Sequence, residues 1–215
     1  MKKFVIAVEG GDGSGKSTAI RHTMDLCCQI GVPFSLIGRG VTDSVPSIHA
    51  LTSVLREHGS NYSLHSDLAI RVAREFVRAQ IAASVSSGIV ILDRFVISLL
   101  ARNIADNINM DWVESSLVDT VRLSELDATL FIDCPFDVAW SRCQKALRSG
   151  VREVSLKDTR GAEYNQKFAM HQKQVFESSS LAMTKMTICN SQDELTFSRQ
   201  IREKITPIVS QLSID

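Results

Sequence analysis

The chain lacks a net charge, because 24 lysine and arginine residues balance 24 aspartate and glutamate residues over its 215 positions. General nucleic-acid or membrane-surface binding relies on a basic patch or excess, so this balance argues against both kinds of partner. The chain also lacks an apolar run near the roughly 18 residues that a transmembrane helix requires. Its apolar stretch after Lys2 and Lys3 is too short for a secretory signal peptide, and we interpret it as the first strand.

Cysteine is scarce and shows no pairing pattern. The five cysteines contain no C-x-x-C pair, and their odd number does not fit a complete disulfide framework. The missing paired spacing also argues against a zinc site built from cysteines. A reduced chain in the cytoplasm is therefore expected. The cysteines are Cys27, Cys28, Cys134, Cys143 and Cys189.

The sequence has no internal repeat, low-complexity tract or linker, and 44% of its residues are hydrophobic, so one domain over residues 1–215 is expected. Strand-like and helix-like segments alternate, which predicts parallel βαβ units. Strands are expected at residues 4–8, 34–37, 89–92, 128–132 and 186–189. Helices are expected at residues 17–30, 46–58, 64–86 and 135–147, and after the capping-box pairs Asp111/Glu114 and Ser191/Glu194.

A glycine-rich loop follows the first expected strand and matches the phosphate-binding pattern G-x-x-x-x-G-K-S. Its glycines let backbone N–H groups turn inward around a phosphate, and the helix that follows adds the partial positive charge of its N-terminus. Lys16 is expected to reach the β- and γ-phosphates of a nucleotide, and the Ser17 hydroxyl to ligate Mg²⁺. The loop consists of Gly10, Gly11, Asp12, Gly13, Ser14, Gly15, Lys16 and Ser17.

The third expected strand ends in a carboxylate. Residues 89–92 are apolar and Asp93 follows them, which is the Walker B pattern that places an aspartate near Mg²⁺. Arg94 comes next. Its planar guanidinium could form a structural ion pair, or it could hold the phosphate of a second, acceptor molecule.

One segment departs from the overall charge balance. Between residues 141 and 173 lie eight basic residues and only three acidic ones. The segment is either a solvated helical face or a mobile lid that closes over polyphosphate, with Gly150 and Gly161 as hinges. We expect a basic lid at about residues 148–162. The basic residues are Arg142, Lys145, Arg148, Arg152, Lys157, Arg160, Lys167 and Lys173.

These motifs together resemble thymidylate kinases, which open with an apolar strand followed by E-G-x-D-x-x-G-K-S-T. Residues 4–18 carry that pattern and end in Thr18, and Asp93-Arg94-Phe95 is similar to the D-R-Y/F/H motif of the family. Asp158-Thr159-Arg160 with Glu163 resembles a loosened version of the D-R-x-E lid. The resemblance implies a P-loop NTPase α/β fold, with a five-stranded parallel sheet flanked by helices. It also implies ATP and Mg²⁺ as cofactors and phosphorylation of a nucleoside monophosphate, foremost dTMP to dTDP. A homodimer is a further expectation from the resemblance.

The resemblance further implies roles for single residues. Asp12 would contact the acceptor sugar or the Mg²⁺ shell, and Ser98 falls on a serine common in the family. Gly13 stands where some members carry a basic residue, so the lid arginines would stabilise the transferring phosphate in its place. The implied arginine roles are acceptor phosphate for Arg39 and Arg94, thymine for Arg74, adenine for Arg142, and catalysis for Arg152 and Arg160.

Two positions depart from the family pattern. Ile70 stands where an aromatic residue usually stacks on thymine, and Arg102 stands where another aromatic residue is usual. If Arg102 points into the pocket, an acceptor with an additional acidic or carbonyl group would give this buried arginine a partner. The departures leave two alternatives open: a related phosphotransferase for another small acceptor (a modified nucleotide, a deoxynucleoside or a specialised metabolite), or a non-catalytic ATP-binding module.

Overall fold

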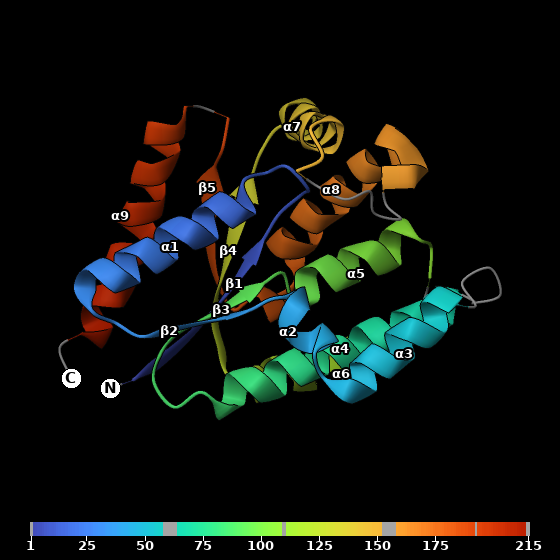
Figure 1. The fold of residues 1–215 in the computed structure, drawn as a ribbon, viewed down its shortest axis with the longest axis horizontal. Coiled ribbons are helices and arrows are strands. Elements are labelled where there is room, and N and C mark those ends of the chain that lie inside the picture. The colour runs from blue at the N-terminus through green and yellow to red at the C-terminus, as the bar shows by residue number, and fades with distance from the viewer. Residues whose placement is uncertain (1, 58–63, 109–110, 152–157, 192, 214–215) are drawn as a thin grey trace.

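In the computed structural model the chain forms a three-layer α/β fold, with helices on both faces of one sheet (Figure 1). The structure describes residues 2–57, 64–108, 111–151, 158–191 and 193–213. The sheet has five parallel strands in the order β2-β3-β1-β4-β5, which confirms the predicted P-loop NTPase architecture. The strands are β1 (Lys3–Glu9), β2 (Phe34–Ile37), β3 (Gly88–Asp93), β4 (Leu126–Asp133) and β5 (Thr184–Cys189).

The helices cover the sheet from two sides. Helices α1 (Lys16–Ile30) and α9 (Glu194–Leu212) lie side by side on one face (Figure 1). The other face packs against α4 (Leu64–Ser84), α5 (Val96–Ala105), α6 (Asp111–Ser124) and α8 (Gly161–Ser178). Three further helices, α2 (Arg39–Asp43), α3 (Pro46–Glu57) and α7 (Phe136–Arg148), lie beside these layers. None of the helices in the described residues is long and apolar enough to span a bilayer.

Strand β1 shows why the central strands of the sheet are continuous apolar runs in the sequence. Its side chains alternate between the two faces, so Val5 and Ala7 join one core cluster while Ile6 and Val8 join the other. Both faces are covered by helices, so the middle of such a strand is apolar on both sides. The carboxyl ends of β1 and β3 lie together, with Val8 opposite Asp93. The glycine loop and the predicted Mg²⁺ ligand therefore meet at one edge of the sheet.

Several helix predictions need correction. The sequence analysis gave no bounds for a helix at α2, α5 or α8, and the structure forms all three. Residues 158–160 form a 3-10 turn (η2, Asp158–Arg160) directly before α8. The predicted Ser191/Glu194 capping box is wrong, because Asp193 is the N-cap of α9 and its carboxylate accepts a hydrogen bond from the Thr196 amide at 2.9 Å. Helix α6 begins at Asp111 as predicted, while the side chains of its proposed capping box lie outside the described residues.

Candidate active site

The glycine loop is held between β1 and α1 in a conformation that only glycine adopts easily. Gly13 and Gly15 have φ angles of 76° and 103°, in the left-handed region. A Cβ atom on Gly13 would lie 2.1 Å from the carbonyl oxygen of Ala139, and one on Gly15 would lie 2.3 Å from the amide nitrogen of Asn190. The loop is therefore packed against α7 on one side and the end of β5 on the other, which preorganises its backbone.

Lys16 opens α1 and is almost fully buried. Its Nζ donates a hydrogen bond to the carbonyl oxygen of Gly11 at 2.6 Å, across the mouth of the loop. Ser17 and Thr18 follow in the first turn, with Ser17 exposed. A lysine, a glycine-rich loop and a helix N-terminus together fit the phosphates of a nucleotide.

The predicted Mg²⁺ ligands also fit that ion. Ser17 and Asp93 lie on adjoining elements at the same sheet edge, and both offer oxygen atoms. The described residues contain no group of three or more histidine, cysteine or acidic side chains that could hold a metal by themselves. Mg²⁺ does not need one, because it takes one or two protein oxygens and completes its shell with phosphate oxygens and water.

Glu9 is a functional residue that the sequence analysis used only as a letter of the motif. It is fully buried at the end of β1, and its Oε1 accepts hydrogen bonds from the backbone amides of Phe95 at 2.7 Å and Ser98 at 3.2 Å. Its Oε2 accepts from the Ser98 hydroxyl. Burial raises the pKa of the Glu9 carboxyl, against the opposing effect of these hydrogen bonds. Glu9 thus caps α5 from a distant strand and ties that helix to the glycine loop.

Arg94 adopts a left-handed backbone conformation, with φ of 64°, directly after β3. Its Nη2 forms an ion pair with Asp12 of the glycine loop, and its Nη1 donates to the Ser98 hydroxyl at 3.1 Å. The structural ion pair and the phosphate contact that the sequence left open for Arg94 therefore involve the same guanidinium. An acceptor phosphate at this position would replace the Asp12 carboxylate as the partner of the Arg94 guanidinium.

Two predicted acceptor arginines converge on a carboxylate that the sequence analysis missed. Arg39 on α2 lies 3.3 Å from one oxygen of Asp43, and Arg74 on α4 donates to the other at 2.9 Å. Burial lowers the pKa of Arg74, while Asp43 opposes this effect. Ile70 lies one helical turn before Arg74 and is half-buried. The i,i+4 spacing of Arg39 and Asp43 was the available signal for this cluster.

Arg102 has its carboxylate partners within the protein. Its side chain is only 12% exposed and lies 3.4 Å from Asp106 and 4.0 Å from Asp67 of α4. Burial lowers the pKa of Arg102, with Arg71 contributing to the same effect. The expectation that a buried Arg102 needs an acidic group on the acceptor is therefore corrected, because Asp106 and Asp67 already supply one.

The remaining predicted nucleotide and lid residues are spread over two helices and the described part of the lid. Arg142 is exposed on α7, with its Nη1 3.6 Å from the sulfur of Cys134. Arg160 pairs with Asp106, and its guanidinium lies 3.4 Å from the centre of the Tyr164 ring. Arg152 lies outside the described residues. The structure thus places Arg160 beside α5 and not beside the glycine loop.

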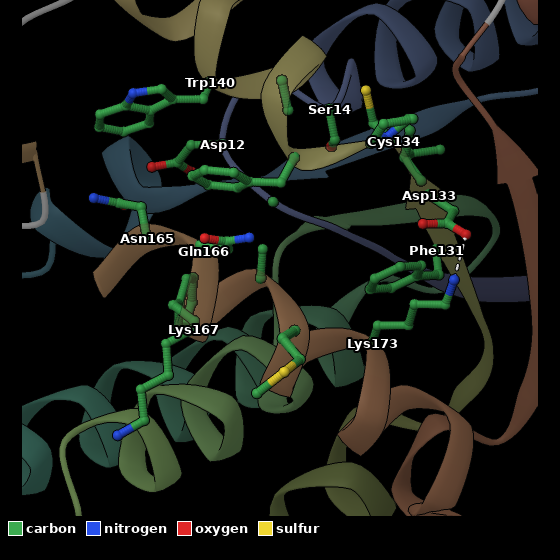
Figure 2. Close-up of a pocket in the computed structure, with 18 of the residues that line it drawn as sticks. Asp12, Ser14, Phe131, Asp133, Cys134, Trp140, Asn165, Gln166, Lys167 and Lys173 are labelled. Atoms are coloured by element: carbon green, nitrogen blue, oxygen red, sulfur yellow. Dashed lines mark hydrogen bonds and ion pairs between the residues drawn. The ribbon is translucent and has the colours of Figure 1, made fainter. Parts of the chain in front are cut away.

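A cavity of about 610 Å³ lies between the glycine loop, the end of β4, α7 and α8. Figure 2 shows Asp12 and Trp140 at one end and an ion pair between Asp133 and Lys173, 2.8 Å long, at the other. Trp140 stacks on Phe136 and also lines this cavity. Arg39, Arg74 and Arg94 are not among the described residues that line it, but Asp12, the partner of Arg94, is.

The parallel sheet, the glycine loop with its buried lysine and the acidic end of the neighbouring strand define a protein of the P-loop NTPase class. The sequence profile of the thymidylate kinase family matches residues 8–200, and the chain belongs to that family. Thymidylate kinase of Xanthomonas campestris pv. campestris (strain B100) is 35% identical over 113 residues. That match covers 50% of this chain and 47% of the relative, so the chain spans about half the length of this relative. Thymidylate kinase of Mycoplasma pneumoniae is 26% identical over 168 residues, which cover 77% of this chain and 79% of the relative.

Proposed function

We propose that the chain transfers a phosphoryl group from ATP to a nucleoside monophosphate, with dTMP as the acceptor and Mg²⁺ as the cofactor. The observation that carries the proposal is the meeting of Lys16 with Asp93, Arg94 and Asp12 at one sheet edge. A donor site and an acceptor site share that edge. Family membership supports the same reaction.

Catalysis in this proposal is electrostatic positioning. Bound Mg²⁺, held by Ser17 and Asp93, supplies positive charge to the phosphates. Lys16 leaves the Gly11 carbonyl and binds the transferring phosphate, where charge spreads over the oxygens in the transition state. The nucleophile is a phosphate oxygen that is already anionic, so the chain needs no strong general base.

The acceptor phosphate is held by exchange of ion-pair partners. Arg94 gives up Asp12, and Arg39 gives up Asp43, for the phosphate dianion. Arg74, on the buried side of the same cluster, faces the base. A nucleoside without the phosphate would not compensate for breaking these pairs, so a monophosphate is the better substrate.

A second acceptor remains a candidate because of Ile70 and Arg102. An isoleucine does not provide the stacking geometry of an aromatic ring. Arg102 and its carboxylates form a charged wall where the family usually has a second aromatic residue. These features favour a pocket that discriminates weakly between bases or that prefers a base other than thymine. A modified nucleotide is the acceptor class that such a pocket would bind.

The deciding experiment measures ADP release with Mg²⁺ and a panel of acceptors: dTMP, other nucleoside monophosphates and thymidine. The proposal expects dTMP to have the highest kcat/KM and thymidine to be far poorer. A monophosphate with a higher kcat/KM than dTMP would support the second candidate, in which the acceptor is another nucleotide. ATP binding without ADP release for every acceptor would indicate a non-catalytic ATP-binding module. The homodimer that family resemblance implies is a separate prediction, which light scattering on the purified chain tests.

A further inference from the structure

Arg94 has an unfavourable backbone conformation directly after β3. Its φ of 64° lies in the left-handed region, which costs energy for a residue that carries a Cβ atom. Such a conformation persists only where the surrounding structure determines it. The groups that bond to the backbone of this turn, which we call the β3 turn (residues 93–95), therefore decide where the Arg94 guanidinium lies.

The N–H groups of the β3 turn bond to β1. The Arg94 amide donates to the carbonyl oxygen of Val8 at 3.0 Å, which continues the pairing between β1 and β3 by one residue. The Phe95 amide donates to the buried Glu9 carboxylate at 2.7 Å. Strand β1 thus supplies acceptors for the turn, whereas the carbonyl groups of the turn bond to a different element.

Arg78 of α4 bonds to those carbonyl groups. Its Nη1 donates to the carbonyl oxygen of Arg94 at 3.2 Å and to that of Asp93 at 3.4 Å. These bonds are long, but a full positive charge attracts both carbonyl dipoles strongly where water is excluded, and Arg78 is only 6% exposed. Asp93 is also held by its pairing with Val8, so the sheet cannot replace the contact to the Arg94 carbonyl.

The buried ion pair to which Arg78 belongs is a poor device for stability. Glu75, three residues earlier on α4, accepts from the same Nη1 atom with both of its oxygens, each at 3.3 Å. The Nε of Arg78 is buried and has no hydrogen-bond partner among the described residues. Apolar side chains of similar size commonly replace such a pair without loss of stability, and an unpaired buried donor is a further cost. These costs favour a role for Arg78 other than stability.

Helix α4 carries Arg74 one turn before Arg78. The i,i+4 spacing places both arginines on one face of the helix. Arg74 bonds to Asp43 of α2, whereas Arg78 bonds to the β3 turn. In the proposed function Arg74 faces the base of the acceptor and Arg94 binds its phosphate. One helix therefore contacts both of these parts of the acceptor side.

We propose that Arg78 is a positioning residue, which holds the β3 turn in its left-handed conformation and thereby directs the Arg94 guanidinium toward Asp12 and Ser98. Arg78 itself contacts no substrate and acts only through Arg94. A guanidinium that is held in place binds a phosphate without losing further conformational freedom. The effect of Arg78 on the acceptor rests on the proposed function, whereas its effect on the turn does not.

Hydrogen exchange at single amides, measured by NMR, tests the turn without any need for activity. Arg78→Met is expected to raise exchange at the Arg94 and Phe95 amides about tenfold relative to the amide of Ile201, which packs on the other face of the sheet. Glu75→Gln is the matched control, because it removes the partner charge and keeps the guanidinium at the turn. Its exchange ratio should equal the wild-type ratio. An unchanged ratio in Arg78→Met, or an equal rise in Glu75→Gln, would overturn the proposal.

A double-mutant cycle tests the effect on the acceptor with Arg78→Met, Arg94→Lys and the double variant. Each single change is expected to raise the KM for dTMP about tenfold, with the KM for ATP within about threefold of the wild-type value. The double variant is expected to equal the worse single variant, because Arg78 acts only through Arg94. A KM for dTMP that rises by the product of the two single changes would show independent effects and would contradict the proposal.

The double variant Glu75→Leu/Arg78→Met covers the case in which Arg78→Met does not fold. It replaces the buried ion pair by apolar side chains, so its midpoint of urea unfolding should equal or exceed the wild-type midpoint. The exchange ratio should nevertheless rise about tenfold. A lower midpoint with uniformly faster exchange would assign Arg78 to general stability, and a wild-type ratio would also refute the positioning role. If the wild-type chain releases no ADP with any acceptor, the proposed function fails, and the exchange ratio alone decides on Arg78.

Discussion

The glycine loop and the arginine clusters prepare for phosphate in different ways. The loop is made by eight consecutive residues whose backbone is held in place by close packing against Ala139 and Asn190. The acceptor side is made by arginines from four segments of the chain, and each of them already holds a carboxylate. In the proposed function the donor site is therefore preorganised by local chain geometry, whereas the acceptor site would bind an anion by exchanging one ion pair for another.

This difference has an energetic consequence. A backbone amide that faces an open loop gives up little interaction energy within the protein when a phosphate binds. An arginine such as Arg94 must leave Asp12 first, so only the difference between two ion pairs contributes to acceptor affinity. Selectivity for a phosphorylated acceptor follows, because a neutral molecule cannot replace the carboxylate.

Removal of the loop lysine should have the largest effect. We expect Lys16→Ala to lower kcat by about 10²–10³, because it removes a preorganised charge from the transition state. Turnover by ADP release is the measurement, with circular dichroism as a check on folding. Lys145→Ala, at an exposed position on α7, is the matched control and should keep its rate. Near-normal turnover of a folded Lys16→Ala chain would contradict a catalytic glycine loop.

The close packing of the loop is tested by comparing two glycines with similar backbone angles. Gly13 has φ of 76° and Gly161 has φ of 79°, but only Gly13 has a backbone oxygen where a Cβ would lie. Gly161→Ala should cost about 1 kcal/mol in free energy of unfolding, from backbone strain alone. Gly13→Ala should cost about 3 kcal/mol or more, because the clash adds to the strain. Equal losses in chemical denaturation would show that the loop is not held by its neighbours.

Glu75 on α4 tests how well a neighbouring arginine compensates for the burial of a carboxylate. Burial raises the pKa of the Glu75 carboxyl to about 7, although Arg78 lies 3.3 Å away and acts in the opposite direction. The unfolded chain ionises this group near pH 4.5, so the stability it contributes is present below that pH and is lost as the pH rises to about 7.

The measurement is the free energy of unfolding of the wild type and Glu75→Gln between pH 4.5 and 8. The wild type should lose about 3 kcal/mol relative to the variant over this range, since each unit of pKa shift corresponds to about 1.4 kcal/mol. Groups that do not interact with Glu75 cancel in the difference. A difference that does not vary with pH would show that Arg78 fully compensates the ionised carboxylate.

The smallest effect concerns the geometry of the acceptor arginine. Arg94→Lys keeps the positive charge and loses the planar fork that contacts Asp12 and Ser98 together. We expect the KM for dTMP to rise about tenfold while the KM for ATP changes little. Thymidine, which has no phosphate, is the control acceptor and should show no corresponding change. Equal increases in the KM for dTMP and thymidine would separate Arg94 from phosphate binding.

Local patterns determined the donor half of this site. The glycine loop, the five strands and the acidic end of β3 are contiguous segments, and their side-chain pattern follows directly from burial on both faces of a parallel sheet. Because β1 and β3 are neighbours in a parallel sheet, their carboxyl ends lie together, with Val8 opposite Asp93.

Tertiary structure alone decided the rest. The bounds of helix α5 could not be predicted because, within its described residues, no side chain of its own caps its N-terminus. Glu9, 86 residues away from Phe95, accepts the hydrogen bond there instead. The sequence likewise identified Arg74, Arg102 and Arg160 as candidates but not their partners Asp43 and Asp106. An isolated charge on a helix has no preferred partner in the sequence, because the ion pair that it forms depends on which elements pack together. Burial then makes the ion pair necessary, because a charge that is withdrawn from water must be paired.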